Sequence, residues 1–152
     1  MLCAIALLAL SPVQASDTDK LRGIYDSVLE GVPKAERIGT SATDFAEKIQ
    51  LFFIRPSRYH IEFPGLVIDG FVEWKGDTLN LFFERGTSMQ NGSRELKDLV
   101  IVGIDRAQSD RIVKWIVGNP QLKISKDLKR IDVVTPKEIS PKKFYFERRW
   151  AE

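Results

Sequence analysis

The chain of 152 residues has few of the side chains that carry most enzymatic chemistry, since it contains one cysteine and one histidine. The cysteine, Cys3, lies in the apolar start of the chain, so a chain beginning at residue 16 would have no thiol for a disulfide bond or for catalysis. A lone histidine leaves only carboxylates to complete a metal site, and there is no DxDxDG-type calcium loop. We therefore expect no metal and no cofactor.

Several catalytic motifs are also missing. The sequence has neither a GxSxG nucleophile motif nor a GxGxxG or GxxxxGK phosphate loop. His60 with Glu62 two residues on is compatible with a general base, but the same spacing occurs on any solvated strand face, which is the interpretation we favour. The acidic residues of the strand region could in principle hydrolyse glycosides, but sequence does not set the distance between them. We expect that the protein is not an enzyme.

The sequence also has no apolar run as long as the roughly 20 residues that a membrane-spanning helix needs. The first fifteen residues, MLCAIALLALSPVQA, combine a short uncharged apolar run with a proline and small residues before a cleavage point at Ala15. This pattern is typical of a signal peptide, although the usual positive charge is missing and a buried N-terminal helix is the alternative. We expect residues 1–15 to be a signal peptide and residues 16–152 to form one domain in the periplasm or outside the cell.

The spacing of apolar residues predicts a helix and then strands. Helical spacing connects Leu21, Ile24, Tyr25, Val28 and Leu29, and the pattern stops before Pro33. The next segment predicts a short helix from about Thr43 that becomes a strand ending at Ile54. The stretch RYHIEF then alternates strictly, which predicts a strand with its aromatic and aliphatic residues buried and with Arg58, His60 and Glu62 on the other face.

The stretch LVIDGFVEWKGDTLNLFFERG predicts a hairpin with Gly76 and Asp77 in a two-residue turn. The apolar face then pairs Trp74 with Leu79, Val72 with Leu81 and Gly70 with Phe83, and the reverse face pairs Glu73 with Asn80, Phe71 with Phe82 and Asp69 with Glu84. The aromatic pair makes the reverse face more apolar than solvent contact requires, so a helix or a ligand should cover it.

The second half of the chain predicts one helix among further strands. The run DLVIVGI predicts a buried central strand, and a helix follows from Asp105, whose spacing to Gln108 resembles a capping box, to Gly118. The remaining strands are predicted at 122–125, 129–135 and 143–150. Together these elements predict an α+β domain: a mostly antiparallel, curled sheet of about six or seven strands, with an N-terminal helix and one later helix packed on it.

Basic and aromatic residues alternate in the C-terminal stretch SPKKFYFERRW. The basic residues are Lys142, Lys143, Arg148 and Arg149. This composition occurs in proteins that bind single-stranded nucleic acid, but we expect no nucleic acid as a partner of an exported chain. Contact with anionic lipid head groups is a second interpretation, and an edge strand protected by its charges is a third.

The stretches RPSRYHIEF and DGFVEW resemble the periplasmic lipoprotein carriers of the LolA and LolB type. The matching positions are Arg55, Pro56, Phe63, Asp69, Gly70 and Trp74. The resemblance implies an incomplete antiparallel barrel, lidded by helices, that holds acyl chains in an apolar cavity. The distance from Arg-Pro to Asp-Gly is shorter here than in the carriers, which implies that a strand pair or the lid is missing.

Two functional hypotheses follow. The first is an exported, non-catalytic and monomeric protein that binds an apolar or acyl ligand on a concave sheet. Its ligand-binding residues would be Phe52, Phe71, Trp74, Phe82 and Trp115. The alternative is an envelope protein-interaction module, such as an assembly factor, an inhibitor or an immunity protein, that uses loop 86–93 or the basic C-terminal residues as a partner-binding edge.

Overall fold

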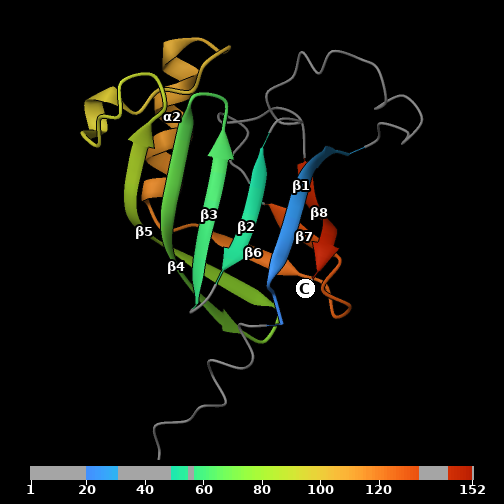
Figure 1. Ribbon diagram of the computed structural model, residues 1–152. Coiled ribbons are helices and arrows are strands. Elements are labelled where there is room, and N and C mark those ends of the chain that lie inside the picture. Colours follow the sequence, from blue (N-terminus) through green and yellow to red (C-terminus); the bar gives the residue numbers. More distant parts are fainter. Residues whose placement is uncertain (1–19, 31–48, 55–56, 134–143, 152) are drawn as a thin grey trace, which may run out of the picture.

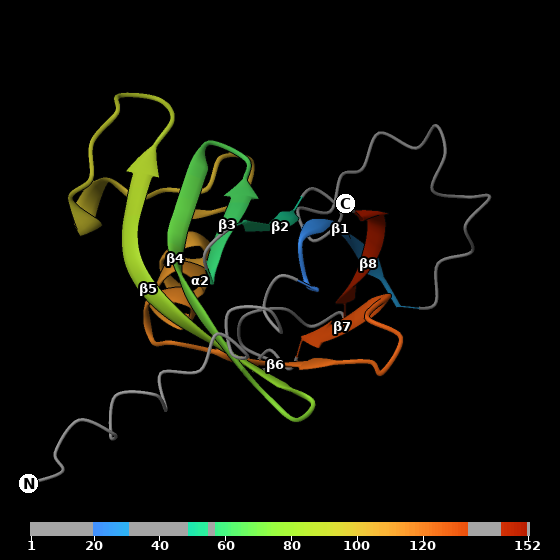
Figure 2. The same ribbon diagram turned by 60° about the horizontal axis from the view of Figure 1, so that its bottom comes forward.

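The computed structural model describes residues 20–30, 49–54, 57–133 and 144–151, and in these residues eight antiparallel strands form a closed barrel. The strands are β1 (Gly23–Leu29), β2 (Gln50–Ile54), β3 (Arg58–Phe63), β4 (Leu66–Lys75), β5 (Thr78–Ser88), β6 (Gln121–Ile124), β7 (Arg130–Val133) and β8 (Phe144–Ala151). Each strand pairs with its neighbours in the chain, and β8 pairs with β1. Figure 1 shows β1 to β5 side by side, and Figure 2 shows the strands arranged in a ring.

The closed barrel overturns the predicted α+β fold. The helical elements among the described residues are the 3-10 helix η4 (Leu96–Asp98) and the helix α2 (Arg106–Val117). The sheet is not an open, curled one, because β1 pairs with β8 from Gly23↔Ala151 to Leu29↔Phe144. For the same reason β8 is not an edge strand, since it is also paired with β7.

The predicted N-terminal helix is wrong, because this segment forms β1. Its residues alternate between buried Tyr25 and Ser27 and half-buried Ile24 and Asp26, as a strand requires. The inward residues include a glycine and a serine, which are not hydrophobic. The positions of the hydrophobic residues alone therefore did not show the two-residue period of a strand. Ser27 belongs inside because its hydroxyl accepts a hydrogen bond from the Ile49 amide at 3.0 Å.

The predicted register of the hairpin is confirmed for the half that lies nearest the turn. Strands β4 and β5 pair as expected from Lys75↔Thr78 to Gly70↔Phe83. Beyond Gly70 the prediction is wrong, since Asp69 pairs with Arg85 rather than Glu84. A β-bulge adds one residue to β5 at this point, and such an insertion leaves no periodic signal in the sequence.

The run from Asp98 to Ile104 is not the predicted central strand, although Leu99 and Ile101 are buried. Its backbone is bonded to a helix side chain and to a turn instead of to a sheet. The Ile101 amide donates to the Ser109 hydroxyl at 2.9 Å, and the Val102 amide donates to the Pro64 carbonyl at 2.8 Å. An apolar run indicates that a segment is buried, but it does not show that the segment pairs in a sheet, so the strand prediction was wrong here.

The later helix and the last three strands are confirmed. The Asp105 carboxylate accepts a hydrogen bond from the Gln108 amide at 2.8 Å, which caps the start of α2. At the other end, the Gly118 amide donates to the Lys114 carbonyl. Strands β6, β7 and β8 overlap the segments predicted at 122–125, 129–135 and 143–150. The proposed signal peptide and the predicted helix near Thr43 lie outside the described residues.

One hydrophobic cluster fills the inner side of the barrel and continues under α2. Strands from around the ring contribute Tyr25, Leu51, Tyr59, Ile68, Leu81, Leu122, Ile131 and Phe146, and α2 contributes Ile112, Val113 and Ile116. Figures 1 and 2 show α2 behind β4 and β5. Among the described helices, none is both long enough and apolar enough to span a bilayer.

Replacing Tyr59 by phenylalanine should stabilise the protein by about 1 kcal/mol, because the buried Tyr59 hydroxyl has no hydrogen-bond partner among the described residues. Tyr25 is the matched control, since its hydroxyl donates to the Leu128 carbonyl at 2.8 Å. Tyr25→Phe should therefore destabilise the protein by about 1 kcal/mol. Urea unfolding of both variants measures the two effects, and equal losses would contradict the difference in hydrogen bonding.

The same two tyrosines should make the barrel sensitive to alkali. Burial raises the pKa of the Tyr25 hydroxyl to about 12, although the nearby Arg148 charge opposes the shift, and burial with the Asp69 charge raises the pKa of Tyr59 as well. Below pH 10 both hydroxyls stay protonated in the folded and the unfolded chain, so neither tyrosine lowers the free energy of unfolding there. Between about pH 10 and 12 only the unfolded chain ionises, so the free energy of unfolding should fall. If a variant with both tyrosines replaced by phenylalanine loses stability as steeply over this pH range as the unchanged chain, ionisation of the two tyrosines is not the cause.

Candidate functional site

Exposed apolar side chains lie in register on the outer face of β2–β5. Ile54 pairs with Arg58, Arg58 with Phe71, and Phe71 with Phe82, so one row crosses all four strands. We call these four residues the aromatic row. The exposed fractions of its apolar members are 47% for Ile54, 45% for Phe71 and 41% for Phe82. Side chains of this kind are usually buried, so an exposed row of them is a candidate binding surface.

Arg58 connects the aromatic row to a charged neighbour. Its guanidinium carbon lies 4.6 Å from the centre of the Phe71 ring, and its Nη2 forms an ion pair with the Glu84 carboxylate. The ring and the carboxylate thus hold the arginine side chain beside Phe71 on the outer face. An arginine on an aromatic ring offers both an apolar surface and hydrogen-bond donors to a partner.

The bulge in β5 determines which charges reach this face. Because β5 has one extra residue between Phe83 and Arg85, both Glu84 and Arg85 are exposed. Glu84 then reaches Arg58, while Arg85 reaches Asp69, with 3.5 Å between Nε and Oδ2. A regular strand would turn one of these two side chains toward the core.

A second row runs beside the aromatic row and contains the only histidine of the chain. Phe52, His60, Asp69 and Arg85 are cross-strand neighbours, and we call them the histidine row. His60 Nδ1 lies 2.7 Å from Asp69 Oδ1, and its Nε2 lies 3.2 Å from Glu62 Oε1. The Phe52 ring meets the imidazole edge-on at 5.5 Å. His60 is on the outer strand face, as predicted, but it is partly buried and both of its nitrogens have acidic partners.

The predicted ligand-binding residues do not form one site. Phe52, Phe71 and Phe82 lie on the outer face, within the two rows. Trp74 and Trp115 are partly buried against the core, and the Trp74 indole donates to the Gly76 carbonyl at 2.8 Å. The wall of the barrel therefore separates the three phenylalanines from the hydrophobic cluster that both tryptophans contact.

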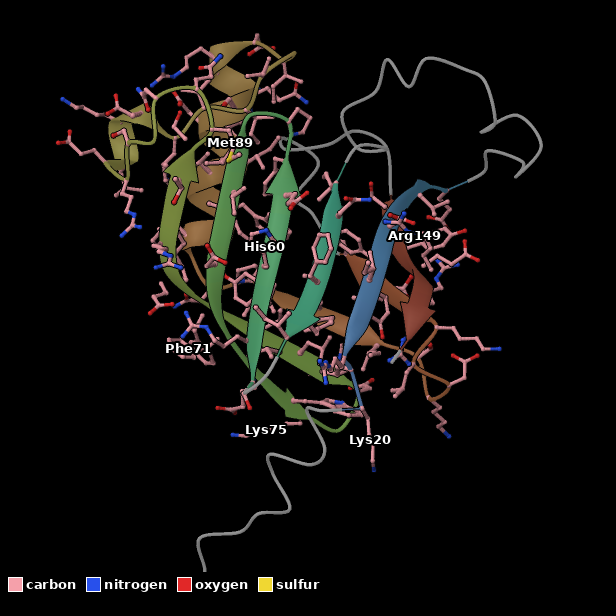
Figure 3. The ribbon with its side chains drawn as sticks, in the orientation of Figure 1. Lys20, His60, Phe71, Lys75, Met89 and Arg149 are labelled. Carbon is pink, nitrogen blue, oxygen red and sulfur yellow. The ribbon has the colours of Figure 1, made fainter. Side chains whose placement is uncertain are left out.

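The predicted basic residues are also distributed. Arg148 Nη2 donates to the carbonyls of Lys20 and Arg22 at 2.9 and 2.7 Å, and its guanidinium lies over the Tyr25 ring. Arg149 is exposed and forms an ion pair with Asp26 at 2.8 Å. Figure 3 shows Arg149 over β1 and β8, apart from His60 and Phe71. Lys142 and Lys143 lie outside the described residues.

Two residues of the aromatic row, Ile54 and Arg58, were not predicted from the sequence as members of a site. A usable signal was present, because the alternation that turns Phe52 outward also turns Ile54 outward. Arg58 was assigned to the correct face, but its contact with Phe71 depends on the register between β3 and β4. That register cannot be read from either strand alone.

No group of three or more His, Cys, Asp or Glu side chains in the described parts of the chain could hold a metal ion. Comparisons with protein-family models, with curated proteins and with solved structures found no match. The resemblance to lipoprotein carriers therefore stays a prediction. The class that can be stated for the described residues is a closed eight-stranded antiparallel barrel with α2 packed on its core and an apolar row outside.

Proposed function

We propose that the protein is a non-catalytic binding protein that docks on a partner protein through the aromatic row. The observation that carries this proposal is the exposure of Ile54, Phe71 and Phe82 in register on three strands. Apolar patches rimmed by polar residues are typical of interaction surfaces. Covering these three side chains would remove apolar area from water without rearranging the barrel.

The shape of the surface favours a protein over a small molecule. Sites for small ligands are concave and bury most of the ligand, whereas the outer face of a closed barrel is convex. Protein interfaces are enriched in aromatic residues and arginine, and these are the types present in Phe71, Phe82 and Arg58. The hypothesis of an acyl ligand on a concave sheet stays a prediction, which the outward position of the phenylalanines does not support.

The charges around the aromatic row favour a partner with charges of both signs. Arg58 is paired with Glu84, and Arg85 lies beside Asp69. Nucleic acid or an anionic membrane would instead be matched by a surface of one sign. A partner surface with an apolar centre and a mixed polar rim fits this arrangement best.

Strand addition at β5 is a less suitable mode of docking. Beyond its pairing with β6 at Thr78–Asn80, β5 pairs only with β4 among the described strands. Three amides of this segment already have acceptors outside β4: Leu81 donates to the Pro120 carbonyl, Phe83 to the Asn119 side chain and Ser88 to the Ser93 carbonyl. These contacts protect the edge, so we assign docking to the face and not to the edge.

A photo-cross-linking amino acid at Phe82, in cells that make the full chain, tests the proposal. We expect a discrete protein adduct whose yield falls at least about fivefold when Phe71→Ser removes an exposed contact, since losing such a contact costs about 1 kcal/mol or more. The matched control places the cross-linker at Lys126, an exposed residue of the β6–β7 turn. Equal adducts from both positions would refute the assignment. A lipid adduct at Phe82 would instead favour the acyl-ligand hypothesis.

A further inference from the structure

The protonation state of His60 decides how many contacts its ring can make. Nδ1 faces Asp69 at 2.7 Å and Nε2 faces Glu62 at 3.2 Å, so each ring nitrogen points to a carboxylate oxygen. A carboxylate is an acceptor only, and a neutral imidazole has a single N–H. The doubly protonated ring is therefore the form that donates to both carboxylates at once. Loss of the proton turns one nitrogen lone pair toward a negatively charged oxygen.

The contact with Glu62 is the one that should break. Asp69 is the nearer partner, its side chain is only 15% exposed, and its other oxygen lies 3.5 Å from Arg85 Nε. The Glu62 side chain is 47% exposed and can turn into water at little cost. The neutral ring should thus keep its proton on Nδ1, toward Asp69, and release Glu62.

We propose that His60 is a proton switch that controls the charge and order of the docking face. Four charged groups meet here: His60 and Glu62 on β3, Asp69 on β4 and Arg85 on β5. From β2, the ring is met by uncharged Phe52. With the imidazolium present the four charges sum to zero, and without it the sum is −1. Histidine is the side chain whose charge ordinarily changes between pH 5 and 8.

This regulation rests on the proposed docking function, because the switch lies beside the aromatic row. His60 follows Arg58 at two residues on the outer side of β3, and Asp69 precedes Phe71 at two residues on β4. Figure 3 shows His60 and Phe71 on the same side of the barrel. Apolar docking favours the state in which every nearby charge is paired, since an unpaired carboxylate must lose water at the interface. Partner binding should therefore be stronger when His60 is doubly protonated than when its ring is neutral.

Nuclear magnetic resonance on the isolated full chain tests the switch without a partner. His60 is the only histidine, so its ring nitrogen signals need no assignment among several. We expect the Nδ1–H tautomer above the transition, and we expect the Glu62 carboxyl carbon signal to change with the same midpoint. His60→Gln should remove that change from Glu62. An Nε2–H tautomer, or a Glu62 signal that ignores the His60 transition, would overturn the proposal.

Cross-linking from Phe82 at two pH values then tests the effect on docking. One pH lies below the His60 transition measured by resonance and the other lies above it. We expect the adduct yield to fall about fivefold from the lower to the higher pH, the size of effect of one charge pair, and to change less than twofold in His60→Gln. Equal loss in both chains would overturn the regulatory role of His60. Absence of any adduct at either pH would refute the docking function instead, while the resonance experiment would still decide whether the switch exists.

Discussion

Replacing Gly70 by alanine should destabilise the barrel by about 3 to 5 kcal/mol, the largest effect of any single methyl group that we expect. A Cβ atom at this position would lie 2.0 Å from the Phe82 carbonyl oxygen and 2.6 Å from Cε1 of Tyr59. The first neighbour is sheet backbone, and the second is a ring with no exposed surface. The carbonyl cannot move away without disturbing the β4–β5 pairing next to the bulge, and the buried Tyr59 ring cannot move without disturbing the core.

Chemical denaturation of Gly70→Ala measures this effect, and Gly76→Ala is its matched control. Gly76 has a positive φ of 62°, but nothing lies within 4 Å of the place that an added methyl group would take, so only backbone strain of about 1 kcal/mol is expected there. A Gly70→Ala variant that loses no more stability than Gly76→Ala would show that β4 can retreat from Tyr59. The assignment of Gly70 to a close-contact position would then be wrong.

Replacing Arg148 by glutamine should cost about 2 to 3 kcal/mol of folding stability. Its guanidinium donates to the carbonyls of Lys20 and Arg22, which connects β8 to the residues that enter β1. It also lies over the Tyr25 ring, so its removal takes packing from the core together with two charged hydrogen bonds. Thermal unfolding should show a clear decrease in Tm.

Arg149 is the matched control, because it is the next residue and carries the same charge. Its ion pair with Asp26 is half exposed, so Arg149→Gln should change stability by about 0.5 kcal/mol or less. Equal losses in the two variants would contradict the structural role of Arg148. Because Arg148 is expected to stabilise the fold, replacing both arginines by acidic residues would disturb folding. A loss of partner binding in that variant would therefore not show that the arginines contact a partner.

Local structure was predictable where the signal is short-range. The hairpin register follows from its two-residue turn, and α2 follows from its cap at Asp105 and its stop at Gly118. Strand β3 follows from strict alternation. Closure of the barrel was not predictable, because Leu29 meets Phe144 across more than a hundred intervening residues and no local pattern encodes that pairing.

The candidate site was only partly predictable, for a related reason. The Phe71–Phe82 pair follows from the hairpin alone and was identified as unusually apolar. Its extension to Ile54 requires the registers of β2 with β3 and of β3 with β4. The contact between His60 and Asp69 requires the second of these registers as well.

Docking through the aromatic row can be tested by hydroxyl-radical footprinting of the full chain in the extract of its own cells, with the purified chain as reference. We expect labelling of Phe71 and Phe82 to fall several-fold in the extract, since a docked partner removes most of the water from an interface core. Met89 serves as the internal standard, because it is 65% exposed outside the aromatic row and should be labelled equally in both samples. Protection of Met89 with unchanged labelling of Phe71 and Phe82 would show that the aromatic row is not the docking surface and would place that surface on the loops after β5.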